Sequence, residues 1–173
     1  MKAIVTPMRT ALTVLTVVAL VSVVSACSMG KDQLSAQDRE KRTVDTVTEA
    51  VPLVQDALDA TKVTVDGGWS SCPGGVGHVY SGGGSIVAPV GNVAQQLNVV
   101  REALTGVGFT EGTLVEGLVS VTRDEVDLTF QLSPARGRGV WAVSYAGPCQ
   151  RYGGDDEDYV QAQNLEPART LLP

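Results

Sequence analysis

An uncharged apolar run near the N-terminus separates the start of the chain from the part that can fold. No residue from Thr10 to Ala26 is charged, and Lys2 and Arg9 precede this run. Its 17 residues fall short of the roughly 20 that a membrane-spanning helix needs. A basic start, an apolar centre and small residues at the end are typical of a secretory signal peptide. We therefore expect residues 1–26 to be removed on export, with an uncleaved anchor as the alternative.

The end of this run carries a more specific pattern. Val24, Ser25 and Ala26 directly precede Cys27, and the four residues resemble the lipobox of bacterial lipoproteins. The resemblance implies diacylglyceryl transfer to the Cys27 thiol and cleavage between Ala26 and Cys27. Two or three acyl chains hold a protein stably on a membrane, whereas one chain binds only marginally. We expect a protein anchored by its lipid at the extracytoplasmic face of the cell membrane, with residues 27–34 as a tether. The alternative is an ordinary signal peptide with a chance cysteine.

The charge balance narrows the classes of partner. The 173 residues include 13 basic and 19 acidic side chains, and loss of Lys2 and Arg9 leaves 11 basic and 19 acidic. The resulting formal charge of −8 argues against nucleic acid or an anionic lipid surface as a partner, because both attract basic proteins. The 147 residues left after cleavage suit one domain with its own core.

Two further cysteines, Cys72 and Cys149, form an even pair in an oxidising compartment. A disulfide is the simplest assignment. It would close a loop of 77 residues and contribute about 4 kcal/mol in the chain-entropy model. Two free buried thiols or a metal pair are the alternatives. A single histidine and the lack of a C-x-x-C spacing argue against zinc, and we expect no cofactor.

Two segments have helical periodicity. Ser35 and Asp38 form an N-terminal capping pattern, and an apolar stripe follows at spacings of three and four residues. The stripe consists of Val44, Val47, Val51, Val54 and Leu58. Pro52 removes a backbone donor, so we expect a kink or a break near Val51. Asn92 can cap a second helix, which we expect to begin directly after it.

Alternation of apolar and polar residues predicts extended segments elsewhere. It is clearest in residues 126–132 and weaker in four other segments: 62–72, 77–88, 118–122 and 140–147. We expect an α+β domain at residues 35–152, built from an antiparallel sheet of about four strands with helices packed on one face. Residues 153–173 begin with an acidic run, and we expect a solvated, flexible tail there.

No catalytic constellation is recognisable in the sequence. His78 is the one histidine, and no G-x-S-x-G motif accompanies it. The glycine run at residues 82–84 lacks the lysine of a phosphate loop, and glycines in a strand more often mark close backbone packing. Asp155, Asp156, Glu157 and Asp158 lack the spacing of a calcium loop.

Several aromatic residues are candidates for a ligand or partner surface, or for the core. These residues are Trp69, Tyr80, Trp141 and Tyr145, and His78 lies among them in the sequence. Core packing is the commoner use of such side chains.

The layout as a whole is similar to small actinobacterial cell-envelope lipoproteins of the LppA-like kind. The features shared are the lipobox, the W-x-x-C segment that ends at Cys72, the helix end from Asn98 to Phe109 and the strand that ends in Pro148-Cys149. The resemblance implies a lipid-anchored α+β domain with one disulfide and no established enzymatic activity. We expect a non-enzymatic module that binds an envelope protein or a small ligand. A small hydrolase that uses His78 and a structural or surface-antigen role are the alternatives.

Overall fold

The computed structural model describes residues 34–112 and 115–173. The expected signal peptide, the lipobox with Ala26 and Cys27, and the tether up to residue 33 lie outside the described residues. The described part contains three α-helices, a short 3₁₀ turn and one antiparallel sheet of seven strands. None of the described helices is long and apolar enough to cross a membrane.

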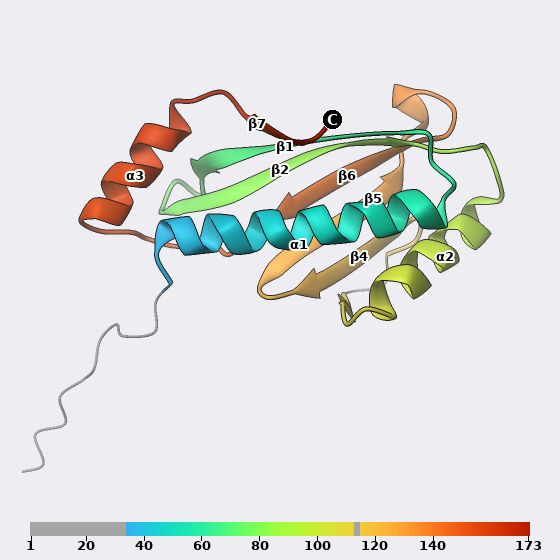
Figure 1. The fold of residues 1–173 in the computed structure, drawn as a ribbon, viewed down its shortest axis with the longest axis horizontal. Coiled ribbons are helices and arrows are strands. Elements are labelled where there is room, and N and C mark those ends of the chain that lie inside the picture. The colour runs from blue at the N-terminus through green and yellow to red at the C-terminus, as the bar shows by residue number, and fades with distance from the viewer. Residues whose placement is uncertain (1–33, 113–114) are drawn as a thin grey trace, which may run out of the picture. The chain divides into compact units, whose positions relative to one another are not determined.

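The elements follow one another in an order that places most strands beside a neighbour in sequence. They are α1 (Ala36–Ala57), β1 (Lys62–Ser71), β2 (His78–Val87), α2 (Val93–Thr105), β3 (Thr110–Glu111), β4 (Leu118–Arg123), β5 (Val126–Leu132), η1 (Pro134–Arg136), β6 (Val140–Ala146), α3 (Asp155–Asn164) and β7 (Arg169–Leu172). The strand order across the sheet is β3-β4-β5-β6-β2-β1-β7 (Figure 1).

The predicted α+β class with an antiparallel sheet is confirmed, but the prediction of about four strands is wrong. Two of the additional strands are edge strands of two and four residues, β3 and β7, which are too short to show an alternating pattern. Strands β1 and β2 pair over ten residues each, although glycines interrupt their alternation. Tertiary pairing therefore decides these strands where the sequence pattern is weak.

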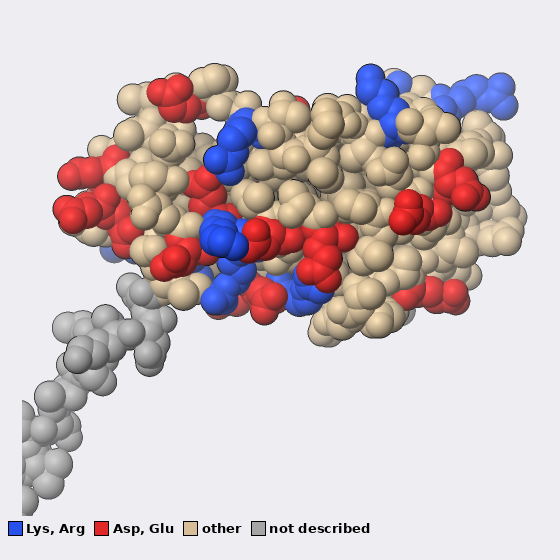
Figure 2. All heavy atoms as spheres, viewed as in Figure 1, with Lys and Arg blue, Asp and Glu red and all other residues tan. Residues whose placement is uncertain are grey.

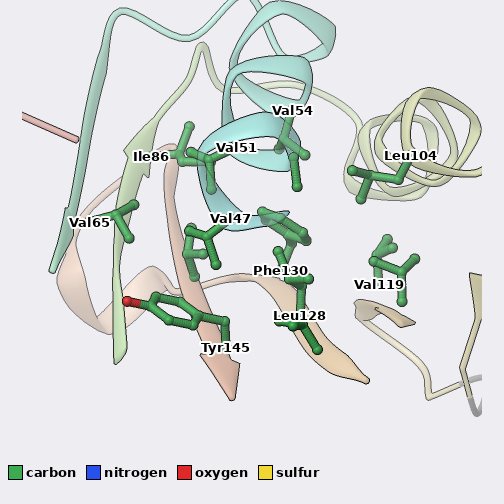
Figure 3. Packing of buried hydrophobic residues seen from close by; sticks show 14 of the residues in the cluster. Val47, Val51, Val54, Val65, Ile86, Leu104, Val119, Leu128, Phe130 and Tyr145 are labelled. Carbon is green, nitrogen blue, oxygen red and sulfur yellow. The ribbon is translucent and has the colours of Figure 1, made fainter. Parts of the chain in front are cut away.

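One face of the sheet is covered by α1, which runs across it (Figure 1). Residues on β1, β2, β4, β5 and β6 that face α1 are buried, and the alternate residues are mostly small or polar and partly exposed. Val47, Val51 and Val54 of α1 point toward the sheet, where Ile86 and Phe130 lie (Figure 3). The apolar stripe of the first helix therefore packs on the domain's own sheet.

Helix α1 starts as predicted, because the Ser35 Oγ accepts a hydrogen bond of 3.1 Å from the Asp38 N–H. The break predicted near Val51 does not occur, and α1 continues through Pro52 to Ala57. Proline costs the helix one backbone hydrogen bond. Ala50, Val51 and Val54, on the sheet-facing side of the helix around it, are fully buried, so packing outweighs that loss.

The glycine run of β2 makes room for a tyrosine. A Cβ atom at Gly82 would lie 2.1 Å from the Asp66 carbonyl oxygen and 2.6 Å from the Tyr145 hydroxyl. A Cβ atom at Gly67, on the neighbouring strand, would also collide with that hydroxyl. The close-packing interpretation of this run is therefore the one that the structure supports.

The C-terminal segment differs from the expected flexible tail, because it forms α3 and β7. Val160 of α3 is fully buried, and Asp66 and Gly67 of β1 pair with β7. The four acidic residues that suggested a solvated tail occupy the first turn of α3, where the helix dipole favours negative charge. One of them, Asp156, also accepts a hydrogen bond of 3.0 Å from the Ala36 N–H at the start of α1.

Candidate functional site at the disulfide end of the sheet

A disulfide joins Cys72 and Cys149, as predicted, with 5.8 Å between their Cα atoms. It connects the end of β1 to the segment that follows β6. His78, at the start of β2, pairs with Gln150 in an isolated bridge, in which each backbone N–H donates to the other residue's carbonyl. The disulfide and this bridge hold the C-terminal segment against the β1–β2 hairpin.

The histidine at this end lies beside an acid. His78 Nε2 is 3.5 Å from the Glu157 Oε1, and the two side chains are 16% and 30% exposed. Both line a surface pocket of about 360 Å³ together with Arg151, Tyr152 and the glycine-rich loop at residues 75–77. Two polar atoms of the lining residues, His78 Nδ1 and the Tyr152 hydroxyl, are buried without a hydrogen-bond partner in the described part of the chain. We call this depression the His78 pocket.

The side chain of Glu40, on α1, is a buried carboxylate that contacts Trp69 of β1. Glu40 is 8% exposed and accepts three hydrogen bonds. The donors are Trp69 Nε1 at 2.8 Å, the Tyr159 hydroxyl at 2.8 Å and the Arg169 guanidinium at 3.1 Å. These donors come from β1, α3 and β7, so one side chain of α1 connects all three elements. We call this arrangement the Glu40 cluster.

The phenols around Glu40 are kept protonated by their surroundings. Burial, followed by the hydrogen bond to Glu40, raises the pKa of Tyr159 to about 12. Burial also raises the pKa of Tyr80 and of Tyr145. At neutral pH these hydroxyl groups are protonated, and that of Tyr159 donates to the carboxylate of Glu40. The adjoining cavity, of about 30 Å³, has room for about one water molecule and for no larger ligand.

The four aromatic candidates belong to the core. Trp69, Tyr80, Trp141 and Tyr145 are each at most 6% exposed, so they do not form the partner surface considered from the sequence. The Trp69 ring makes edge contacts with Tyr80 and Tyr152 at centroid distances of 5.6 and 5.5 Å. The structure thus brings Trp69, Tyr80 and His78 to the disulfide end.

Trp141 lies elsewhere, opposite Ile86 and Leu132 in the sheet. Tyr145 lies between the two groups, and its hydroxyl donates to the Asp66 carbonyl oxygen at 3.1 Å. Neither residue contributes to the His78 pocket.

Sequence reasoning missed the polar residues that complete this end: Glu40, Tyr152, Glu157, Tyr159 and Arg169. One signal was present, because Glu40 continues the apolar stripe of α1 by one step of four residues before Val44. A charged residue on a buried stripe indicates a paired, buried charge. Within residues 34–112 and 115–173, no three His, Cys, Asp or Glu side chains gather as a metal site would require.

Comparisons with known proteins do not identify a relative. The chain matches no family model, and no curated protein or solved structure shows significant similarity to it.

Proposed function

We propose that the protein is a lipid-anchored, extracytoplasmic binding module of the cell envelope, like the LppA-like lipoproteins that its layout resembles. The disulfide supports this location, because such bonds persist in oxidising compartments. It also leaves Cys27 as the one cysteine of the chain outside the disulfide, in the position where the lipobox resemblance requires a free thiol.

The observation that carries the binding role is the His78 pocket. Buried polar atoms in native proteins nearly always have a hydrogen-bond partner. His78 Nδ1 and the Tyr152 hydroxyl have none among the described residues, and both belong to the lining of a pocket of about 360 Å³. Both atoms are closed off from solvent, so a polar ligand or partner would satisfy them after the lining side chains turn toward it.

The proposed anchor would place this pocket near the membrane. Eight residues separate Cys27 from Ala36, so the tether can span at most about 30 Å between the lipidated cysteine and the start of α1. The Ala36 N–H donates to Asp156, which is the neighbour in sequence of Glu157. The His78 pocket therefore lies at the end of the domain where the proposed tether enters, and its ligand would be a component of the membrane-proximal envelope.

The anchor is tested by Cys27→Ser, with detergent phase separation and the mass of the mature N-terminus as readouts. We expect the precursor to stay unprocessed or the protein to leave the membrane fraction. A Cys27→Ser variant that is still cleaved and still membrane-bound would overturn the anchor.

The binding role is tested by a photo-crosslinking amino acid at Val76, which is 51% exposed and lines the His78 pocket. The matched control is the same amino acid at Val107, which is 43% exposed and lies outside the His78 pocket. In intact cells we expect a defined cross-linked product from position 76 and none from position 107. Identical product patterns from both positions would count against a binding role for the pocket.

A small hydrolase is the second candidate, because the structure places an acid and a hydroxyl near the histidine. Glu157 is 3.5 Å from His78 Nε2, and Ser71 lies directly opposite His78 in the β1–β2 register. In serine hydrolases, however, Nδ1 faces the acid and Nε2 faces the nucleophile. Here Nε2 faces the acid, so the imidazole ring would have to flip by about 180° before Nδ1 could face Glu157.

The hydrolase is tested with p-nitrophenyl esters and with a fluorophosphonate label on the full chain. An active serine hydrolase would label at Ser71, and both Ser71→Ala and His78→Ala would abolish turnover. Ester hydrolysis that survives both substitutions, or an unlabelled Ser71, would rule out this candidate.

A further inference from the structure

The opposite end of the sheet carries an apolar pocket that the proposed function does not use. It has a volume of about 200 Å³ and is lined by Val90, Leu132, Pro134, Gly137, Arg138 and Gly139. The lining is mostly carbon, and Val90 at its rim is 64% exposed. A large exposed apolar residue beside an apolar pocket is typical of a contact surface. We call this region the η1 end, after the turn that contains Pro134.

Unpaired cations gather at the η1 end. Five basic residues form no ion pair with another residue in the described part of the chain: Arg42, Lys62, Arg136, Arg138 and Arg151. Three of the five belong to this end. Arg136 and Arg138 lie within and just after η1, and Figure 2 shows blue side chains gathered over this part of the molecule.

The sheet register brings the third cation close. Lys62 is opposite Val87, and Val87 is opposite Val140, which follows Arg138 by two residues. Adjacent strands are about 4.8 Å apart, so the backbone of Lys62 on β1 lies about 10 Å from that of Val140 on β6. That spacing corresponds to about three residues of an extended peptide.

We propose that the η1 end binds an acidic peptide segment of a partner protein, with one large apolar side chain in the pocket and carboxylates on the surrounding cations. The charge pattern supports this occupant, because an otherwise acidic domain keeps three cations together without counter-charges. An apolar pocket with adjacent cations fits an apolar residue flanked by Asp or Glu. The inference rests on the proposed binding role, but it concerns a surface separate from the His78 pocket.

A protein partner fits this location better than a membrane surface does. Ala57 and Leu58, at the end of α1, line a depression that also includes Val90. The 22 residues of α1 span about 33 Å, so the η1 end is about one helix length from Ala36. With the proposed anchor attached on the Ala36 side, the η1 end is the end of the domain distal to the attachment point.

The test uses the full chain in a non-ionic detergent and a fluorescein-labelled hexapeptide with two acidic residues on each side of Leu-Phe. Binding is followed by fluorescence anisotropy. We expect the double variant Arg136→Glu, Arg138→Glu to weaken binding about tenfold. The control double variant, Lys41→Glu with Arg42→Glu on α1, has the same change in net charge, lies outside both pockets and should alter affinity less than twofold. Val90→Ser should weaken binding without changing its salt dependence.

Equal weakening by the two double variants would show a general charge effect and overturn the proposal. So would undiminished binding of a hexapeptide in which Leu-Phe is replaced by Ser-Ser. A preference of the chain for phosphatidylglycerol over phosphatidylcholine vesicles, lost in Arg136→Glu, Arg138→Glu while the peptide does not bind, would assign the η1 end to an anionic lipid surface instead. If the Val76 cross-link persists when any of these results is obtained, the binding module stands and only the peptide site fails.

Discussion

The two ends of the sheet use their charges in opposite ways. At the disulfide end, Glu40 is buried and accepts three hydrogen bonds, and a covalent link closes the hairpin onto the C-terminal segment. At the η1 end, three cations form no ion pair with a described residue, and Val90 is exposed. Charges that contribute to folding are paired internally, whereas unpaired charges are available to a partner. Stability and the binding of an acidic peptide should therefore respond to substitutions at different ends.

The largest effect should come from removing the disulfide. Cys72→Ala together with Cys149→Ala should lower the free energy of unfolding by about 4 kcal/mol, because the unfolded chain regains the freedom of a 77-residue loop. Urea denaturation followed by tryptophan fluorescence measures this change. Dithiothreitol should destabilise the wild-type protein to the same extent and leave the double variant unaffected. A difference below about 1 kcal/mol would mean that the disulfide end is held by its non-covalent contacts.

The next effect should come from Glu40. Glu40→Leu leaves the Trp69, Tyr159 and Arg169 donors without their acceptor, and we expect a loss of about 2–3 kcal/mol in the free energy of unfolding. Glu40→Gln keeps one acceptor oxygen and should cost less. Hydrogen exchange should show faster exchange in α3 and β7, since both are tied to α1 through this carboxylate.

The matched control for Glu40 is Glu49→Leu, on the same helix. Glu49 also pairs with an arginine, Arg123, but its side chain is 54% exposed. Exposed ion pairs contribute little, so the loss should stay below about 1 kcal/mol. Equal losses for the two variants would contradict the distinction between buried and exposed carboxylates.

A smaller effect should appear at alkaline pH. The folded-state pKa of Tyr159 is about 12, above the ordinary value of about 10, so its stabilising effect is complete below pH 10 and is lost as the pH rises through 12. The free energy of unfolding should therefore fall between pH 10 and pH 12. Tyr159→Phe should fall less steeply over the same range, since Tyr80 and Tyr145 still contribute. An unchanged slope would mean that Tyr159 is neither buried nor bound to Glu40 in solution.

The sequence predicts the regular parts of this molecule well. The Ser35 cap, the Asn92 cap and the alternation of residues 126–132 depend on neighbours within a few positions, and all are present in the structure. The pairing of Cys72 with Cys149 was predictable because no other pair remained. These features need no knowledge of how distant segments meet.

The missed features all depend on contacts between distant segments. The Glu40 cluster joins residues 29, 119 and 129 positions apart in the chain, and no local pattern links them. The acidic run at residues 155–158 indicates a solvated segment until α1 supplies a donor for Asp156 and β1 supplies an edge for β7. The His78 pocket depends on the same C-terminal segment, because Glu157 is part of α3. Misplacing the tail therefore hid most of the candidate site.

The smallest effect on stability should come from the η1 end. Lys62→Gln, Arg136→Gln and Arg138→Gln should each change the free energy of unfolding by less than about 0.5 kcal/mol, because the exposed side chains form no ion pair with a described residue. Arg136 makes one exposed hydrogen bond, to the Gly84 carbonyl oxygen at 3.2 Å, so its effect should be the largest of the three. The triple variant should be slightly more stable at low ionic strength, since three neighbouring like charges repel one another, and the gain should vanish in 0.5 M salt. Urea denaturation at the two salt concentrations measures both effects. A loss of more than about 1 kcal/mol would show that these cations contribute to folding, and the contrast between the two ends of the sheet would fail.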